Sequence, residues 1–212
     1  MTRLLFSAMF NQRCHGLDNV PTTGGTIIAS NHLSFLDPHA VGSVIPRSVY
    51  YLGRRTLFKR ALWAAVLRSW QVVPVDPSGK PDIAGLKAIL GRLEQGHVVV
   101  LFPEGTRSPD GNFQSAKAGV GLLAAKAGAL VVPARVFNAH KVCPKGQRWP
   151  RRGQLDVVYG EPVNYNGMVA DAKAKGGREA KEVYQKIADD ILERIKALRL
   201  PAGPCEVKAD AP

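Results

Sequence analysis

Short apolar runs alternate along this chain with longer stretches in which apolar residues recur at helical spacing. The β-rich apolar runs are Thr26–Ser30, Ser48–Leu52, Val72–Val75, Val98–Phe102, Leu130–Val136 and Leu155–Tyr159. The helix-like stretches between them are Pro38–Ile45, Thr56–Trp70, Ile83–Gln95 and Ala116–Ala127. Buried-type strands that alternate with helices predict an α/β fold, with a mostly parallel central sheet flanked by helices.

The last long stretch predicts an amphipathic C-terminal helix over residues 178–198. Its apolar residues at helical spacing are Val183, Tyr184, Ile187, Ile191, Ile195 and Leu198. Such a helix docks its apolar face on the core. The proline-bearing tail 201–212 is expected to fray. Because the sequence has neither an internal repeat nor a linker, we expect one domain over residues 1–212.

The composition fits one folded domain in a reducing compartment. With 212 residues, of which 45% are hydrophobic, the chain can bury a full core. Its three cysteines, Cys14, Cys143 and Cys205, are scattered and have no CxxC spacing. A disulfide framework or a structural zinc site is therefore disfavoured.

The net charge of +12 is concentrated in two blocks that contain no acidic residue, from Pro38 to Val75 and from Gly111 to Leu155. Such blocks indicate an anionic partner, nucleic acid or an anionic lipid surface, although a solvated basic face looks the same. The chain has no RRM, KH, zinc-finger or helix-turn-helix signature, and its aromatic residues are not interleaved with the basic blocks on a sheet. We therefore expect no nucleic-acid partner.

A histidine and a carboxylate lie five residues apart where the first long strand ends. His32 follows the run Thr26–Ser30, and Asp37 precedes Pro38 at the start of a helix. Catalytic groups often lie where a strand of an open α/β sheet ends. An imidazole there can take a proton from an attacking alcohol, while a carboxylate on its other nitrogen fixes the tautomer. The pair therefore suits a general base that activates a substrate hydroxyl.

Other interpretations of these residues remain open. Asp37 before Pro38 also fits a helix N-cap with proline at the first helical position. His32, Asp37 and His39 could ligate a metal, but no further Cys, His or Glu cluster supports such a site. A serine hydrolase is disfavoured because the sequence lacks a G-x-S-x-G elbow.

A second motif, Phe102–Ser108, follows the apolar run that begins at Val98. Within it, Gly105 allows close approach of a ligand to the backbone. Thr106 supplies a hydroxyl, and the planar guanidinium of Arg107 can hold a phosphate through two hydrogen bonds. Glu104 would repel phosphate, so it is expected to orient Arg107 or to bind a substrate hydroxyl. A surface turn with an incidental arginine is the alternative.

Taken together, the two motifs resemble the glycerolipid acyltransferase family, which is typified by 1-acylglycerol-3-phosphate acyltransferase. Asn31, His32, Ser34 and Asp37 fill the pattern N-H-x-S-x-x-D, and Phe102–Ser108 fills F-P-E-G-T-R-S. The segment 53–58 resembles an intervening block with a basic residue before Leu-Phe. Residues 113–119 and 131–133 resemble the last block. The family-like core extends over residues 25–136.

The resemblance implies transfer of a fatty acyl group from a thioester, acyl-CoA or acyl-carrier protein, to a lysophospholipid hydroxyl in phospholipid biosynthesis. It assigns His32 as general base and Asp37 as its orienting partner, the HX4D motif. It places Glu104, Gly105, Thr106 and Arg107 in the pocket for the acceptor headgroup, and it requires neither a cofactor nor a metal.

One departure from the family pattern bears on the acceptor. After the run Val72–Val75 the family usually has Asp followed by Arg or Lys, whereas here Asp76 is followed by Pro77. Lys80 is a candidate substitute. The acceptor is expected to be 1-acylglycerol 3-phosphate. Glycerol 3-phosphate, a lyso-aminolipid, or a non-enzymatic basic lipid- or nucleic-acid-binding role are the alternatives.

The sequence predicts peripheral attachment to the cytoplasmic face of a membrane. No run reaches the ~18 consecutive apolar residues of a spanning helix. The N-terminal run Met1–Asn11 is short and has no cleavage site after it. The segment Arg54–Trp70 combines basic residues with apolar ones at helical spacing, which suits the surface of an anionic membrane. A core-packed helix with basic residues facing water is the alternative.

Overall fold

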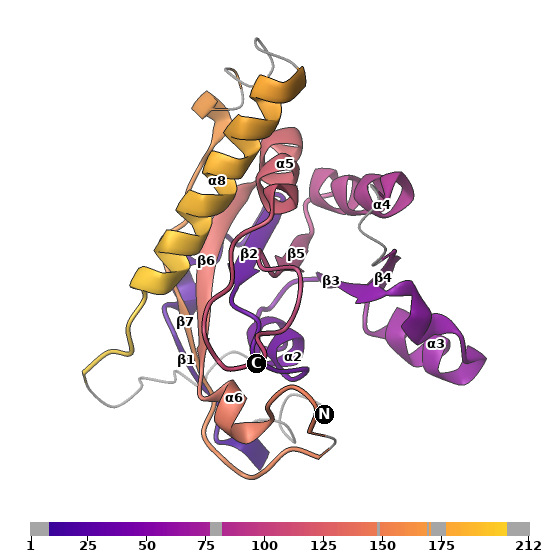
Figure 1. Ribbon diagram of the computed structural model, residues 1–212, viewed down its shortest axis with the longest axis vertical. Helices are drawn as coiled ribbons and strands as arrows, with labels where there is room; N and C mark the ends of the chain where they lie inside the picture. The colour runs from indigo at the N-terminus through magenta and orange to yellow at the C-terminus, as the bar shows by residue number, and fades with distance from the viewer. Residues whose placement is uncertain (1–8, 77–81, 148, 169, 171–176, 203–212) are drawn as a thin grey trace.

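A seven-stranded sheet forms the centre of the protein. The computed structural model describes residues 9–76, 82–147, 149–168, 170 and 177–202. Within this sheet the strand order is β1-β7-β6-β2-β5-β3-β4 (Figure 1). The strands are β1 (Arg13–His15), β2 (Thr26–Ser30), β3 (Val49–Arg54), β4 (Val72–Val75), β5 (Val98–Leu101), β6 (Leu130–Phe137) and β7 (Asp156–Tyr159). β6 and β7 pair antiparallel and every other pairing in the sheet is parallel, which confirms the predicted α/β class.

Strand β2 lies in the interior of the sheet. All of its residues are buried, and it is paired with β5 on one side and β6 on the other. Its side chains alternate between two hydrophobic clusters, with Ile27 in one and Ile28 in the other. The first cluster is covered by α4 (Ile83–Glu94), α5 (Ala118–Ala127) and α8 (Gly177–Ala197), and the second by α2 (Asp37–Gly42) and α6 (Ala139–Val142). The loop that follows β2 therefore starts from a rigid position.

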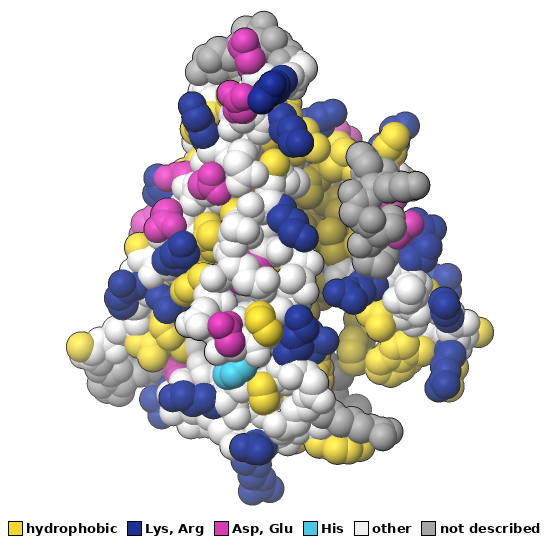
Figure 2. Space-filling view, in the orientation of Figure 1, with side chains coloured by type: hydrophobic (Ala, Val, Ile, Leu, Met, Phe, Trp, Pro, Cys, Tyr) yellow, Lys and Arg dark blue, Asp and Glu magenta, His cyan; other side chains and the backbone are white. Residues whose placement is uncertain are grey.

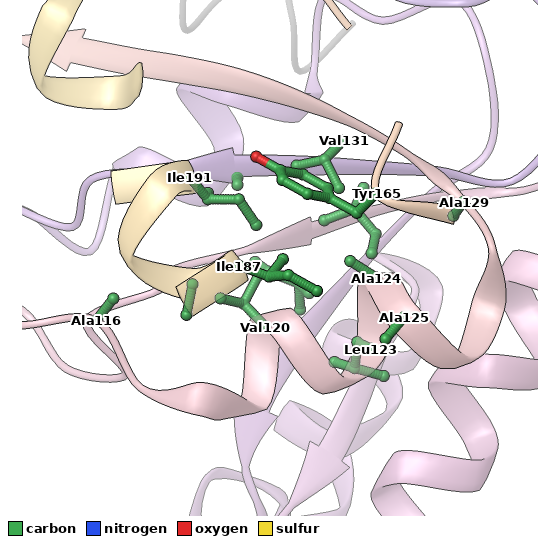
Figure 3. Close-up of a cluster of buried hydrophobic side chains, with 14 of the residues drawn as sticks. Ala116, Val120, Leu123, Ala124, Ala125, Ala129, Val131, Tyr165, Ile187 and Ile191 are labelled. Atoms are coloured by element: carbon green, nitrogen blue, oxygen red, sulfur yellow. The ribbon is translucent and has the colours of Figure 1, made fainter. Parts of the chain in front are cut away.

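The C-terminal helix packs as its periodicity predicts. Ile187 and Ile191 of α8 are fully buried and point toward Val120 of α5 (Figure 3). The two helices approach closely at Gly121, where a β-carbon would overlap the backbone oxygen of Tyr184. The helix begins at Gly177 and ends at Ala197, one residue before the predicted end.

The stretch Thr56–Trp70, which was predicted as one helix, is divided in the structure. A 3-10 turn, η2 (Arg55–Phe58), is followed by a separate helix, α3 (Ala61–Ser69). Arg60 between them has extended backbone angles, φ −97° and ψ 122°. The break lets the turn fold back on the sheet, because Leu57 and Phe58 pack over the bare backbone of Gly53.

Two short elements were not predicted from the sequence, because neither contains a run of apolar residues. Strand β1 contains Arg13 and His15 and is held by its pairing with β7, and α6 is only a single turn. No helix of the described residues is long and apolar enough to cross a membrane. The first eight residues, Lys80 and the tail from Gly203, for which predictions were made, lie outside the described residues.

Candidate active site

Asn31 sets the position of the loop that carries His32. Its side-chain nitrogen donates to the carbonyl of Val136 at 3.0 Å, and its oxygen accepts from the N–H of the same residue at 2.7 Å. Beyond the end of β2, the Asn31 side chain thus bonds to β6 in place of a further backbone pair. The asparagine therefore fixes where the strand ends and the loop begins.

The structure brings His32 and Asp37 together. Nδ1 of His32 lies 2.9 Å from Oδ2 of Asp37. That same oxygen accepts from the backbone N–H groups of Leu33 and Ser34, at 2.6 and 2.7 Å. Asp37 is fully buried, whereas His32 is 17% exposed. Because Nδ1 is occupied by the carboxylate, Nε2 is the ring nitrogen left to exchange a proton with a substrate.

A second contact fixes the orientation of the imidazole. The His32 ring stacks on Phe102, with centroids 4.0 Å apart and planes at 17°. Phe102 directly follows β5, so the ring is held between the loops after β2 and β5. An imidazole held on one edge and one face is oriented before any substrate arrives.

Asp37 does not cap its own helix. Helix α2 begins at Asp37 itself, and the carboxylate bonds backward to the loop through Oδ2. Its other oxygen, Oδ1, is buried and has no hydrogen-bond partner among the described residues. Nor do the described residues contain a group of three or more His, Cys, Asp or Glu that could hold a metal. His39, the third candidate ligand, lies near Trp70, with ring centroids 6.5 Å apart.

Glu104 joins the two motifs through the backbone. Its carboxylate is 1% exposed; Oε1 accepts from the N–H of His32 at 3.0 Å and Oε2 from the N–H of Gln114 at 2.9 Å. The N–H of Ser108 donates to the carbonyl of His32 at 2.7 Å. Burial raises the pKa of Glu104, and the two backbone donors oppose that rise. The sequence suggested that Glu104 orients Arg107 or binds a substrate hydroxyl, which stays a prediction; the hydrogen bonds that its carboxylate accepts come from the backbone of His32 and Gln114.

In the turn Glu104–Arg107, the three residues after Glu104 are more exposed to solvent than Glu104 is. Gly105 has φ of 70°, a conformation that favours glycine, and its N–H donates to the carbonyl of Phe102 at 2.9 Å. Gly105 is exposed, and Thr106 and Arg107 are half-buried. The arginine carbonyl accepts from Nζ of Lys145 at 3.2 Å. A hydroxyl and a guanidinium therefore border the glycine without being sealed in the core.

Lys117 is a site residue that the sequence reasoning did not single out. A β-carbon at Gly105 would lie 3.0 Å from Cδ and 3.1 Å from Nζ of Lys117. The backbone N–H of Lys117 donates to the carbonyl of Pro103 at 2.9 Å, which holds the residue against the turn. The available signal was a lysine directly before α5, ten residues after Arg107. It adds a second positive charge beside the glycine.

Comparison with known proteins decides the family. The chain matches the sequence profile described as Acyltransferase over residues 11–136. The chain belongs to this acyltransferase family. The match begins before residue 25, where the resemblance of the motifs starts, and it ends at residue 136, as expected.

Individual relatives agree with the family assignment. The chain is 32% identical to the chloroplastic 1-acyl-sn-glycerol-3-phosphate acyltransferase of Arabidopsis thaliana, over 83% of this chain and 48% of the relative. It is 24% identical to the 1-acyl-sn-glycerol-3-phosphate acyltransferase of Bacillus subtilis, over 76% of this chain and 78% of the relative. The chain thus spans about half the length of its plant relatives.

A solved acyltransferase structure has the same fold. The crystal structure of the 1-acyl-sn-glycerophosphate acyltransferase of Thermotoga maritima superposes with a TM-score of 0.69 at 23% identity. The similarity covers 94% of this chain and 78% of the other. The sheet and its covering helices are therefore those of a known acyltransferase fold.

Proposed function

We propose that this acyltransferase moves a fatty acyl group from a thioester, acyl-CoA or acyl-carrier protein, to the hydroxyl of 1-acylglycerol 3-phosphate in phospholipid biosynthesis. The observation that carries the proposal is the His32–Asp37 pair, in which Asp37 binds Nδ1 and leaves Nε2 for a substrate. The pair lies next to the turn that carries Arg107, and Lys117 packs against Gly105 of this turn. The names of the relatives in Arabidopsis thaliana and Bacillus subtilis agree with this choice of acceptor.

In the proposed reaction His32 acts as the general base. Nε2 takes the proton of the acceptor hydroxyl while its oxygen attacks the thioester carbonyl carbon. Asp37, the positioning residue, stabilises the imidazolium that forms, because its negative charge lies 2.9 Å from Nδ1. When the tetrahedral intermediate collapses, the carbon–sulfur bond breaks and the thiolate takes the proton back from Nε2. The products are an ester and a free thiol.

The turn at Gly105 would bind the acceptor headgroup. Arg107 offers a planar pair of donors to phosphate oxygens, and Lys117 adds a compact positive charge beside the glycine. Glu104 contributes by holding this turn against the backbone of His32, so the phosphate and the general base keep a fixed spacing. The proposal therefore separates a catalytic pair, a binding turn and a connecting carboxylate.

We propose further that the enzyme attaches peripherally to the cytoplasmic face of an anionic membrane through segment 54–70. Leu62 is 83% exposed and Trp63 48% exposed in α3. Exposed basic residues surround them at Arg54, Arg55, Lys59, Arg60 and Arg68. Apolar side chains with flanking cations fit the interface between lipid headgroups and acyl chains.

The test is thiol release from palmitoyl-CoA by the purified protein, in detergent micelles, with lysophosphatidic acid and a panel of other acceptors. We expect release that depends on lysophosphatidic acid and disappears in His32→Ala. Release with glycerol 3-phosphate or a lyso-aminolipid alone would keep the chemistry and change the acceptor. Absence of release with both CoA and carrier-protein donors, from folded protein, would contradict the transferase.

A further inference from the structure

The three tryptophans of the chain lie in two segments, and all three are exposed. Trp63 and Trp70 belong to α3 and its C-terminal end, and Trp149 lies in the connection that follows α6. Trp149 is 74% exposed, more than either of the others. Tryptophan is usually well buried in a folded domain, and its amphipathic ring favours the membrane–water interface. The exposure of Trp149 therefore needs an explanation that the α3 segment does not provide.

Basic residues flank Trp149 in the sequence, as they flank Trp63. Lys145, Arg151 and Arg152 are exposed, and together with Trp149 we call them the tryptophan loop. They belong to the sequence block from Gly111 to Leu155, which contains no acidic residue. Asp110 lies directly before this block. Figure 2 shows basic and apolar side chains side by side over the α3 region, whereas the acidic side chains in this view lie mostly on the α8 side. The charge of the tryptophan loop is complementary to an anionic surface.

The tryptophan loop and α3 lie on opposite sides of the catalytic loop. β6, which leads to the tryptophan loop, is next to β2 on one side, and β3, which leads to α3, lies beyond β5 on the other. All these strands are parallel, so the segments that follow them emerge at the same edge of the sheet. In Figure 1, α2 lies between α6 and α3 at this edge.

The tryptophan loop is also tied to the proposed headgroup turn. Nζ of Lys145 donates to the carbonyl of Arg107 at 3.2 Å, and the N–H of Arg151 donates to the carbonyl of Val142 at 2.9 Å. Phe35, in the catalytic loop itself, is 47% exposed. Apolar rings are thus presented from three successive places along the edge that carries His32.

We propose that the tryptophan loop is a second contact with an anionic bilayer, which places Trp149 among the lipid headgroups on the other side of His32 from α3. With two contacts on opposite sides of the catalytic loop, the sheet edge faces the membrane from which a lipid acceptor must come. A single contact at α3 would leave the molecule free to tilt away. The inference rests on the proposed membrane attachment, and it adds a second binding surface and an orientation.

Tryptophan fluorescence can test each contact separately. Trp63→Phe/Trp70→Phe leaves Trp149 as the only tryptophan, and Trp70→Phe/Trp149→Phe leaves Trp63. The control replaces all three by phenylalanine and adds Thr23→Trp, a change at an exposed residue in the loop that leads into β2, at the opposite edge of the sheet. Each protein is mixed with phosphatidylglycerol vesicles that carry brominated acyl chains, after circular dichroism has shown that it is folded.

We expect blue-shifted and quenched emission for Trp149 and for Trp63, and no change in the emission of the Thr23→Trp control. Quenching of Trp63 with unchanged Trp149 would overturn the second contact and leave attachment through α3 intact. If the emission of neither Trp149 nor Trp63 changes, the proposed membrane attachment is contradicted as well. Thiol release in detergent still tests the transferase activity independently. A response of Trp149 to acyl-carrier protein but not to vesicles would identify an acidic protein as the partner and overturn the proposal.

Charge reversal gives a second readout. Arg151→Glu/Arg152→Glu is expected to lower the vesicle partition coefficient at least about tenfold at low salt, since each basic residue near an anionic surface contributes about 1 kcal/mol. The matched control is Lys126→Glu/Lys181→Glu, which reverses two exposed lysines on α5 and α8. An equal loss in both pairs would show that overall charge, and not the tryptophan loop, determines binding.

Discussion

The catalytic loops and the η2–α3 segment emerge at the same edge of the sheet but are built in opposite ways. Asp37 and Glu104 are charged and almost fully buried, and each accepts at least two backbone N–H groups. In η2–α3 the charged side chains are exposed, and only Ala64 and Leu67 of α3 are buried. One region holds its charges in a single geometry, and the other presents them to solvent.

This difference separates two kinds of function. A buried carboxylate held by backbone donors cannot move without leaving those donors unpaired, so it suits chemistry that needs fixed distances. Exposed arginines and lysines on flexible stems can adapt to a surface whose charges are not at fixed positions. Substitutions in the first region should therefore act on turnover, and those in the second on attachment. Substitutions in both regions test this division, and their expected effects on turnover range from very large to very small.

Replacement of His32 should have the largest effect. His32→Ala removes the general base, which typically contributes ~10²–10⁴-fold, and we expect kcat to fall by an amount near the upper end. Thiol release in detergent with lysophosphatidic acid measures the loss. His15→Ala, on the edge strand β1, is the control and should keep full activity. If His32→Ala retained more than a tenth of kcat, the division between the regions would break down.

Asp37→Asn should reduce turnover less, by about 10²-fold. Its amide oxygen can still accept from the N–H groups of Leu33 and Ser34, so the loop keeps its shape, but the negative charge beside Nδ1 is lost. Because Asp37 is buried and acts through His32, kcat should fall while KM for the acceptor stays within about twofold. A rise in KM with unchanged kcat would mean that Asp37 binds substrate.

The sequence predicted the catalytic region better than the attachment region, for a physical reason. Asn31, His32 and Asp37 act within one loop, so their spacing along the chain determines their spacing in space. The strands β2 and β4 were also located to the residue, because each is a short apolar run with clear ends. These parts depend on contacts that are local or repeat along a strand.

Contacts between distant segments were not predictable in the same way. The role of Glu104 depends on the N–H groups of His32 and Gln114, which only the fold brings to its carboxylate. Lys117 reaches Gly105 because its own backbone is bonded to Pro103. The continuous helix expected over 56–70 is interrupted at Arg60, whose extended backbone separates η2 from α3. Helical periodicity does not record such tertiary contacts.

Lys117→Met should affect acceptor binding more than turnover. The methionine keeps an unbranched apolar stem over Gly105 but removes the positive charge. A hydrogen bond to a charged group contributes about 1.5–3 kcal/mol, so KM for lysophosphatidic acid should rise roughly tenfold or more with little change in kcat. Lys126→Met, on an exposed position of α5, is the matched control. An equal effect on an acceptor without a phosphate would show that Lys117 does not bind the headgroup.

Charge reversal in the attachment region should have the smallest effect on turnover. Lys59→Glu/Arg60→Glu changes two exposed residues between η2 and α3, where no buried group among the described residues depends on their charge. In detergent micelles we expect kcat within about twofold of the parent. On phosphatidylglycerol vesicles the partition coefficient should fall at least about tenfold in low salt, and the difference should shrink as ionic strength rises because surface charges are screened. Flotation of both proteins at several salt concentrations measures this difference.

If the variant lost activity in micelles as well, the positive charge of η2–α3 would take part in the reaction itself. The separation between a fixed catalytic region and an adaptable attachment region would then be wrong.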